Sequence, residues 1–589
     1  MVSPLQAVEA HAAARERLSP VSLLAWHADS PKKVLRALRS GNEQALWAAW
    51  TAHLKKRRRP KSHRQLFQTA TQQGSATWAG PAALHGAEPA ESAEQAALRN
   101  GYLSDRLSVE AAQHWINMAH HLPKLSRSLE PELWWDLLRE TIQVVDDAER
   151  ERVECASLPG QLLRGELPLT LAILFPELNA CRQLHEPARA ALAQGMEELL
   201  DGEGVLHAKE WANYVPLLRC WIRARAIGGS ADATWNAASE AQFRHLIQET
   251  LRAARPDGQP LFVGADRLDP KLLRAAVRLC DDRKLRKLWK QTRRRTARAA
   301  ARTSSAEKPL GLAGVTSEWA QSAILRSAWT KDSHRLGVLY PHQRVQLELH
   351  QADELVWSGD WDLQVRLNGQ AAMPDGEWEE VCWFSDPAVD YLELEIPLAG
   401  GWKAQRKMLL ARQDEFLYLA DAVIGPAAAE INYCSRLPLA AGVHFEPAAE
   451  TREGILKTKR SRLLVLPLAL AEWRSDPRSG ALCQTETGLQ LRQEAVGQTL
   501  FAPLWFDLNP KRNRQPCTWR QLTVAQLREV ESRDRAVGFR VQVGTEQWLV
   551  YRSFQQPSNR TLLGHNLASE SLVGRFTTKG EVQALVEVE

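Results

Sequence analysis

The chain has 589 residues, more than one ordinary hydrophobic core supports, so two or three domains are expected. Its 75 Lys and Arg against 70 Asp and Glu give a net charge of +5, and a total this small does not by itself indicate a nucleic-acid partner. The eight cysteines form no CxxC pair, which excludes zinc-ribbon and thioredoxin-type sites.

The N-terminal part predicts a helical extension over residues 1–68, followed by a linker over residues 69–98 that is rich in Ala, Gly, Ser, Gln and Pro. The first twenty residues contain no apolar segment typical of a signal peptide. No later stretch reaches about 18 uninterrupted apolar residues. We therefore expect a cytoplasmic protein without a membrane partner.

Two periodicities divide the rest of the chain. Over residues 99–300 apolar residues recur at helical spacing, as in EPELWWDLLRETIQVV, and the regular succession of helices suits an α/α toroid. Residues 301–318 predict a second linker. Over residues 319–589 the period becomes two, as in DWDLQVRLNGQ with its Asn-Gly turn. The predicted fold class is α+β and multidomain, with a toroid-like helical domain before an antiparallel β-sandwich.

One stretch, LLDGEGVLHAKEWANYVPLLRCW, places a histidine, a carboxylate and a tyrosine at the opening of an apolar helix: His207, Glu210 and Tyr214. A tyrosine near positive charge has a lowered pKa, so it can serve as a base or an acid. Ordinary structural roles are the alternative. Tyr214 would then be a packed tyrosine with a hydrogen-bonded hydroxyl, and His207 a loop histidine.

The order of parts, and three sequence segments, resemble the heparinase II/III family of polysaccharide lyases. ALAQGMEELLDGEGVLHAKEWANYVPLL is similar to the family's Asp-Gly turn and following helix, with Tyr214 at the tyrosine position. TLRAARPDGQPLFVGAD is similar to a family turn and contains Asp266. YLELEIPLAGGWKAQRKMLLARQDEFLYLADAVIG is similar to the strands of the family's sandwich.

The resemblance implies β-elimination on an acidic, uronic-acid-containing polysaccharide, with no cofactor and no metal. It places Tyr214 at the catalytic tyrosine position, and we expect His207, seven residues before it, to share catalysis. The expected substrate-binding residues are Glu210, Arg219, Arg223, Asp266, His342 and His350. Two family motifs have no counterpart: LLRGELPLTLAILFPEL lacks the helical Asn-His pair, and VLYPHQRVQLELHQADELVW lacks the histidine-rich segment.

Three functional alternatives therefore stand beside an active lyase. In the first alternative the protein is a catalytically silent relative that binds glycans, and in the second it is a silent relative that organises a complex. Alternatively, it is an intracellular nucleic-acid or protein-interaction protein that uses its basic segments, Lys55–Arg59 and Arg283–Arg302. Solvated charged helices are the alternative explanation of these segments.

Aromatic and polar residues also alternate between Trp519 and Asn566, among them Arg520, Trp548, Tyr551 and Arg552. This pattern suits either hydrogen-bonded edge residues of the sandwich or a sugar-binding face.

Overall fold

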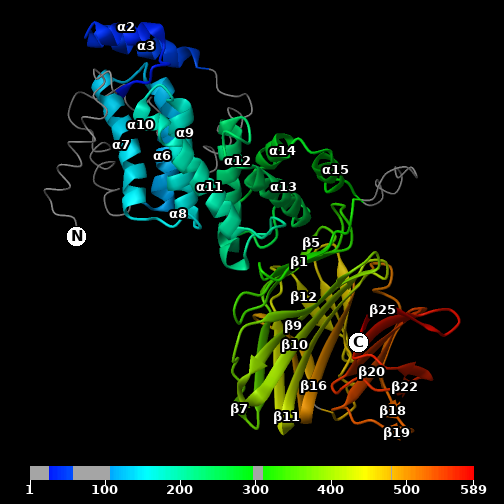
Figure 1. The fold of residues 1–589 in the computed structure, drawn as a ribbon. Helices are drawn as coiled ribbons and strands as arrows, with labels where there is room; N and C mark the ends of the chain where they lie inside the picture. The colour runs from blue at the N-terminus through cyan, green and yellow to red at the C-terminus, as the bar shows by residue number, and fades with distance from the viewer. Residues whose placement is uncertain (1–24, 58–105, 265, 296–309, 479) are drawn as a thin grey trace. The chain divides into compact units, whose positions relative to one another are not determined.

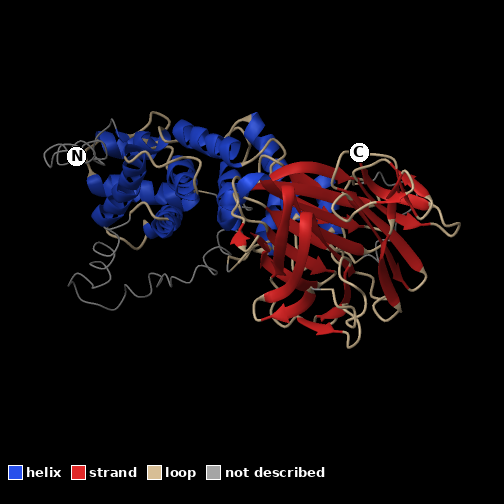
Figure 2. Cartoon of the chain, turned by 90° about the horizontal axis from the view of Figure 1, so that it is seen from below, coloured by secondary structure: helices blue, strands red, loops and turns tan. Residues whose placement is uncertain are grey.

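A computed structural model describes residues 25–57, 106–264, 266–295, 310–478 and 480–589. The chain divides into two compact units. The helical unit contains residues up to 206, 210–248 and 263–285, and the strand unit contains residues 207–209, 249–262 and 286–589. Figure 2 shows the helices in blue and the strands in red. The predicted order, helices first and antiparallel strands after them, is confirmed.

Parts of the predicted domain plan lie outside the described residues. The predicted linker over 69–98 does so entirely, and so do residues 1–24 and 58–68 of the N-terminal extension. Of the predicted linker over 301–318, only residues 310–318 are described, and they contain the first strand, Val315–Ser317. The predicted domain boundaries remain predictions.

Figure 1 labels the α-helices. In chain order the helices are α2 (Lys32–Arg39), α3 (Glu43–Lys56), α6 (Val109–Leu125), α7 (Pro131–Arg150), α8 (Leu158–Gly160), the π-helical turn η3 (Gln161–Glu166), α9 (Leu167–Leu174), α10 (Asn179–Arg182), α11 (His185–Leu199), the 3-10 turn η4 (Ala208–Asn213), α12 (Tyr214–Gly228), α13 (Ala237–Arg252), α14 (Pro270–Leu279) and α15 (Arg283–Gln291). None of these described helices is both long and apolar enough to cross a membrane.

Local sequence signals set several helix starts. Ser108 caps α6 by accepting a hydrogen bond from Ala111 N at 3.2 Å, and Asp269 caps α14 by accepting one from Lys271 N at 2.7 Å. Such caps satisfy amides that have no partner inside the helix. Pro131 begins α7, where a missing N–H costs nothing.

Tryptophans fill much of the helical core. Trp50 of α3 meets Trp26 edge to face at 5.0 Å and Trp134 of α7 at 6.3 Å. Trp50 and Trp134 are fully buried. Edge-to-face rings add to the stabilisation that burial provides, so these tryptophans are packing residues. They attach α3, at one end of the unit in Figure 1, to α7.

The described strands form four sheets, and neighbouring strands in each sheet pair antiparallel. The first sheet has the order β1 (Val315–Ser317), β2 (Ser322–Arg326), β3 (Arg335–Leu339), β4 (Gln346–Gln351) and β5 (Glu354–Asp360). The main path of the eleven-stranded sheet is β12 (His444–Pro447), β13 (Gly454–Lys457), β14 (Arg462–Pro467), β16 (Gly488–Asp507), β11 (Phe416–Leu437), β10 (Trp402–Ala411), β9 (Val389–Leu398) and β8 (Glu379–Ser385).

The remaining strands complete these sheets and form two more. Attached to the large sheet are β6 (Asp362–Leu367), β7 (Gln370–Ala371) and β15 (Ala481–Thr485). The third sheet has the order β17 (Cys517–Leu522), β20 (Ala536–Val543), β21 (Glu546–Ser553), β24 (Ser571–Phe576) and β25 (Val582–Val588). The fourth has the order β19 (Glu529–Val530), β18 (Val524–Gln526), β22 (Arg560–Leu562) and β23 (His565–Leu567).

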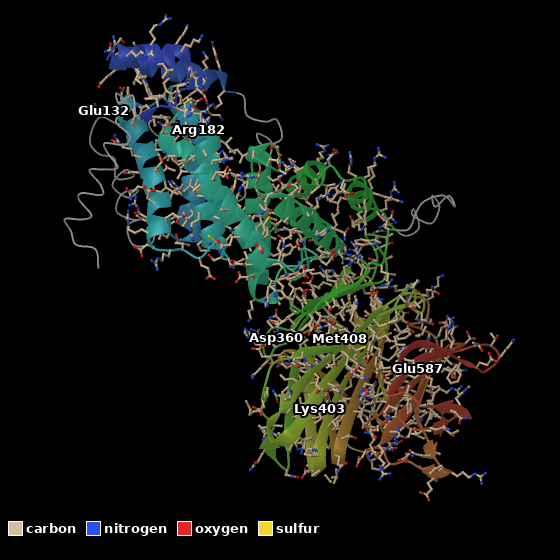
Figure 3. The ribbon with its side chains drawn as sticks, viewed as in Figure 1. Glu132, Arg182, Asp360, Lys403, Met408 and Glu587 are labelled. Carbon is tan, nitrogen blue, oxygen red and sulfur yellow. The ribbon has the colours of Figure 1, made fainter. Side chains whose placement is uncertain are left out.

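The large sheet carries a hydrophobic core on each face. Met408 of β10, labelled in Figure 3, and Leu410 pack into the core shared with the first sheet. Leu409 and Ala411 point the other way, into the core shared with the third sheet. Side chains alternate between faces along a strand. A strand buried on both faces therefore reads as a continuous apolar run, as this part of β10 does.

Residues 249–262 lie in the strand unit although they precede its first strand by more than fifty residues. Buried Arg326 of β2 donates hydrogen bonds to the carbonyls of Leu251 and Arg252, at 3.1 and 2.5 Å. Glu348 of β4 accepts a hydrogen bond from Phe262 N at 2.8 Å. The segment thus supplies hydrogen-bond partners to polar groups that are buried in the first sheet.

Candidate functional site

The Asp-Gly-Glu-Gly turn after α11 has a specific geometry in the helical unit. Asp201 Oδ1 accepts hydrogen bonds from Glu203 N and Val205 N, at 2.9 and 2.8 Å. Gly204 has a φ of +79°, and a Cβ there would lie 2.3 Å from Leu246 N. Only glycine meets both conditions without strain. The turn therefore fixes the path of the chain toward η4 and Tyr214.

Tyr214 begins α12 and is buried, with 3% of its surface exposed. Its ring stacks on Trp211, with the centroids 5.0 Å apart and the planes 25° apart. Glu210 accepts a hydrogen bond from Asn213 Nδ2 at 2.9 Å. Glu210 thus lies in η4 and Tyr214 is the first residue of α12, with its ring buried and stacked on Trp211.

Arg219 lies on α12 beside the loop before α14. It forms an ion pair with Asp266 at 3.6 Å and donates a hydrogen bond to Arg267 O. Burial lowers the pKa of Arg219, and the charge of Asp266 partly offsets that effect. Arg219 and Asp266, both predicted to bind substrate, are therefore brought together.

Arg223, one helical turn further along α12, is committed to another partner. Its Nε and Nη2 donate to the two carboxylate oxygens of Glu166 at 2.6 and 2.7 Å. Burial would lower the pKa of Arg223, but the Glu166 carboxylate outweighs it and the pKa is raised. Glu166 ends η3, whose Gln161 accepts a hydrogen bond from Trp221 Nε1 at 2.7 Å. A forked pair of this kind fixes both side chains, and a substrate-binding role for Arg223 remains a prediction.

In the strand unit, His207 lies against an exposed tryptophan. Its ring meets Trp319 edge to face, with the centroids 5.2 Å apart. Ala208 N donates to Ala320 O at 2.8 Å, which holds the segment beside the turn between β1 and β2. Trp319 is 49% exposed, so this turn offers an indole to solvent.

Glu377 links His342 with the turn between β1 and β2, because it interacts with His342, Lys209 and Gln321. His342 Nδ1 lies 2.9 Å from Glu377 Oε1, and both side chains are about half exposed. The pKa of Glu377 is lowered, first by the hydrogen bond with His342 and further by the charge of Lys209 and a hydrogen bond from Gln321. The structure therefore brings together six residues, which we call the Trp319 group: His207, Lys209, Trp319, Gln321, His342 and Glu377.

His207 and His342 of this group were predicted from the sequence, whereas Trp319, Lys209, Gln321 and Glu377 were missed. The four lie in turns or at the start of a short helix, with no spacing that marks them as neighbours. A half-exposed tryptophan is the one feature that distinguishes the group, and sequence does not report exposure.

The predicted residue His350 is not in this group. It is buried on β4, with its Nε2 2.9 Å from Glu348 Oε1. Glu348 also accepts two hydrogen bonds from Arg255, at 2.6 and 2.5 Å. Burial lowers the pKa of His350. Burial alone would raise the pKa of Glu348, but hydrogen bonds from His350 and Arg255 outweigh it and lower that pKa. His350 thus helps to hold residues 255–262 against the first sheet.

The second basic segment, Arg283–Arg302, is described as far as Arg295. Arg293 stacks over Trp289 at 4.8 Å, and Arg295 pairs with Asp353 at 2.5 Å. Of the run Lys55–Arg59, the last two residues lie outside the described part. Across the described ranges, no cluster of three or more His, Cys, Asp or Glu residues could hold a metal ion.

Comparison with known proteins gives relatives by structure alone. No family model matches the sequence, and no curated protein matches it. The crystal structure of heparinase III superposes with a TM-score of 0.62 at 11% identity, covering 91% of this chain and all of that one. The chain has a heparinase-like fold.

A heparan sulfate lyase from Pedobacter heparinus superposes with a TM-score of 0.54 at 12% identity, over 92% of this chain and 99% of the lyase. A mutant of that lyase gives a TM-score of 0.56 at 11% identity, over 90% and 98% of the two chains. The likeness therefore spans both the helices and the strands of this chain. These comparisons offer no support for a nucleic-acid partner.

Proposed function

We propose that this protein binds an acidic, uronic-acid-containing polysaccharide and cleaves it by β-elimination. The observation that carries the proposal is the Trp319 group, an exposed indole with two histidines, a lysine, an amide and the Glu377 carboxylate that pairs with His342, on a heparinase-like fold. Aromatic surface with a few directed polar groups suits a sugar ring, and Lys209 and the histidines suit its acidic substituents. We also propose that the helices form an α/α toroid and the sheets a β-sandwich.

β-Elimination on a uronate removes the proton from the ring carbon beside the carboxylate. The electron pair of that C–H bond becomes a ring double bond, the bond to the neighbouring sugar oxygen breaks, and this oxygen takes up a proton. The reaction therefore needs a base, an acid and a group that neutralises the carboxylate. We assign proton transfer to Tyr214 and His207, and carboxylate binding to Arg219, with Glu210, Asp266, Arg223 and His342 in supporting positions.

A catalytically silent, glycan-binding protein is the second candidate, and two observations favour it. Tyr214 is buried and stacked on Trp211, and Arg223 is already neutralised by Glu166. A fold can be kept while its chemistry is lost, so such a protein would retain saccharide binding at the Trp319 group without elimination.

The test follows the ultraviolet absorbance of the unsaturated product during incubation with a panel of uronic-acid polysaccharides. Tyr214→Phe removes only the hydroxyl, and His207→Gln removes the titrating ring. Each should lower the rate by about 10²–10⁴-fold, the usual contribution of a general acid or base. Phe384→Ala, which removes an exposed aromatic ring elsewhere on the strand unit, is the matched control and should retain the wild-type rate.

The outcomes separate the two candidates. A rate that Tyr214→Phe leaves unchanged overturns the assignment of that tyrosine. Folded protein that forms no product from any substrate overturns the lyase proposal. If saccharide binding then persists and falls in Trp319→Ala, the silent binding protein is the correct function.

A further inference from the structure

A second exposed tryptophan lies on the loop between β14 and β15. Trp473 is 52% exposed, whereas eight other tryptophans among the described residues are fully buried. A single exposed apolar residue needs no explanation by itself. Two features distinguish Trp473 from a single exposed apolar residue. Hydrogen bonds fix the backbone of its loop, and several arginines lie near it in the fold.

One guanidinium group fixes this loop. Arg452 donates hydrogen bonds to four backbone carbonyls of the loop: those of Ala471 at 3.1 Å, Trp473 at 2.6 Å, Asp476 at 3.0 Å and Arg478 at 3.3 Å. Hydrogen bonds from a charged donor are stronger than neutral ones. Four of them on one loop fix the backbone that carries the indole before any ligand arrives, which lowers the entropy cost of ordering the loop on binding.

The loop runs along β17, the edge strand of the third sheet. Trp519 Nε1 donates to Leu470 O at 2.9 Å, and Thr518 Oγ1 donates to Glu472 Oε2 at 2.9 Å. Alternate residues of a strand share one face, so Arg520 lies on the same face of β17 as Thr518. This face therefore continues from the loop of Trp473 onto the sheet.

Two arginines oppose each other on that face. Arg520 of β17 pairs directly with Arg540 of β20, which places their Cα atoms about 5 Å apart. Like charges in such a pair are destabilising. Within the described residues, neither guanidinium has a carboxylate within 4.0 Å. Arg540 donates to Gln542 Oε1 at 3.1 Å, and its Nε is buried without a hydrogen-bond partner in the described part of the chain. The pair lacks the anion that would neutralise it.

Further arginines increase the positive charge beside the indole. Arg474 and Arg478 are exposed loop residues, and Arg478 is held at 2.8 Å by Asp476. Partial burial and the charge of Arg478 lower the pKa of Arg533, and the charge of Asp476 partly offsets these effects. Asp476 thus offsets part of the charge of Arg478 and Arg533.

We propose that Trp473, Arg474, Arg478, Arg520, Arg533 and Arg540 form a second saccharide-binding surface, which takes a chain bearing sulfate or carboxylate groups. We call it the Trp473 surface. The C–H face of a sugar ring packs on the electron-rich indole, and arginine forks match planar or tetrahedral oxyanions. The inference rests on the proposed function for the class of polymer. It adds a non-catalytic binding surface, which would hold a long chain by a second attachment and raise its effective concentration.

The experiment measures binding of a fluorescein-labelled heparan sulfate oligosaccharide to the full chain by anisotropy. Trp473→Ala and the double variant Arg520→Gln with Arg540→Gln should each weaken binding by about tenfold, with a smaller salt dependence in the double variant. Phe384→Ala, again the matched exposed aromatic, should bind as the wild type. The double variant removes a like-charge pair, so its thermal midpoint should stay the same or rise, whereas loss of a structural arginine would lower it.

Each outcome tests a separate part of the proposal. Wild-type affinity in both Trp473→Ala and the double arginine variant would overturn the Trp473 surface. Equal affinity for a single-stranded oligodeoxynucleotide of the same net charge would overturn its assignment to a saccharide. Product formation is followed separately with the same variants. Absence of elimination with Trp473-dependent binding would refute only the proposed lyase, and elimination with Trp473-independent binding would refute only the second surface.

Discussion

His334 is a buried histidine between β2 and β3, next to Arg335. Burial and the charge of Arg335 lower its pKa from the usual 6.5 to about 4. The folded protein therefore keeps this ring neutral at a pH where the unfolded chain protonates it. The stability that this neutral ring retains is present above pH 6.5 and is lost as the pH falls from 6.5 to about 4.

We expect the free energy of unfolding to decrease by about 3 kcal/mol across that window because of His334 alone. In His334→Gln, which does not titrate, this part of the pH dependence should disappear. Urea denaturation of both proteins at pH 7 and at pH 4.5 measures the difference. The same loss of stability on acidification in the two proteins would show that His334 does not cause it.

The sequence did not predict that two arginines of the first sheet are buried. Arg326 and Arg335 are fully buried, and each donates to backbone carbonyls: Arg335 binds Ala254 O, and Arg326 binds Leu251 O. Any residue type can supply a backbone carbonyl, so the sequence does not mark these acceptors. They also lie more than seventy residues away from the two arginines in the chain. Sequence patterns therefore predict an exposed charge at positions where the fold buries one.

At the level of elements, the sequence predicted where the turn after α11 lies, but it did not predict which of its two glycines the structure requires. DGEG reads as a turn because glycine and aspartate favour one, yet its two glycines have different roles. Gly204 has positive φ and lies against the backbone of α13, whereas nothing lies within 4 Å of a Cβ at Gly202.

Gly204→Ala should therefore lower the free energy of unfolding by about 1–3 kcal/mol or more, since a left-handed conformation and a steric clash act together. Gly202→Ala, in the same turn, is the matched control and should change it by less than about 0.5 kcal/mol. Thermal or urea denaturation of both variants makes the comparison. Equal stabilities would mean that the turn tolerates a side chain at residue 204.

Long strands were predicted only in pieces. β11 extends over Phe416–Leu437, although the sequence indicates a strand only in FLYLADAVI, before Gly425 and Pro426. The pairing with β16 continues beyond a register shift between Ile424 and Ala429. A bulge can accommodate glycine and proline inside a strand. From the sequence pattern alone, however, Gly425 and Pro426 indicate the end of the strand.

Over the whole molecule, the change of periodicity predicted that helices come first in the chain and antiparallel strands after them. It could not show that residues 249–262 pack with the strands, because these residues read as the end of a helix and a turn. Their role follows from the buried groups that they satisfy. Arg326 and Arg335 donate to their carbonyls, and Glu348 accepts from Arg255 and Phe262 N.

A chain of residues 310–589 should consequently be less stable than a chain of residues 249–589. In the shorter chain, Arg326, Arg335 and Glu348 lose these partners, and each buried polar group left unsatisfied costs about 1–3 kcal/mol. Gly337 would also lose its contact with Phe262, against which a Cβ at residue 337 would lie at 2.7 Å. We expect the shorter chain to unfold at a markedly lower urea concentration, or to expose apolar surface and aggregate.

The comparison includes 249–589 with Arg255→Leu and Phe262→Ala, which keeps the segment but removes two of its contacts. Its midpoint should fall between those of the other two chains, because the carbonyls that receive Arg326 and Arg335 remain. Equal midpoints for all three chains would show that residues 310–589 form a complete folding unit, and that the contacts of residues 249–262 add nothing to its stability. A graded series would instead place the functional boundary of the strand unit before residue 249, since polar groups buried at its first sheet depend on carbonyls from the end of α13.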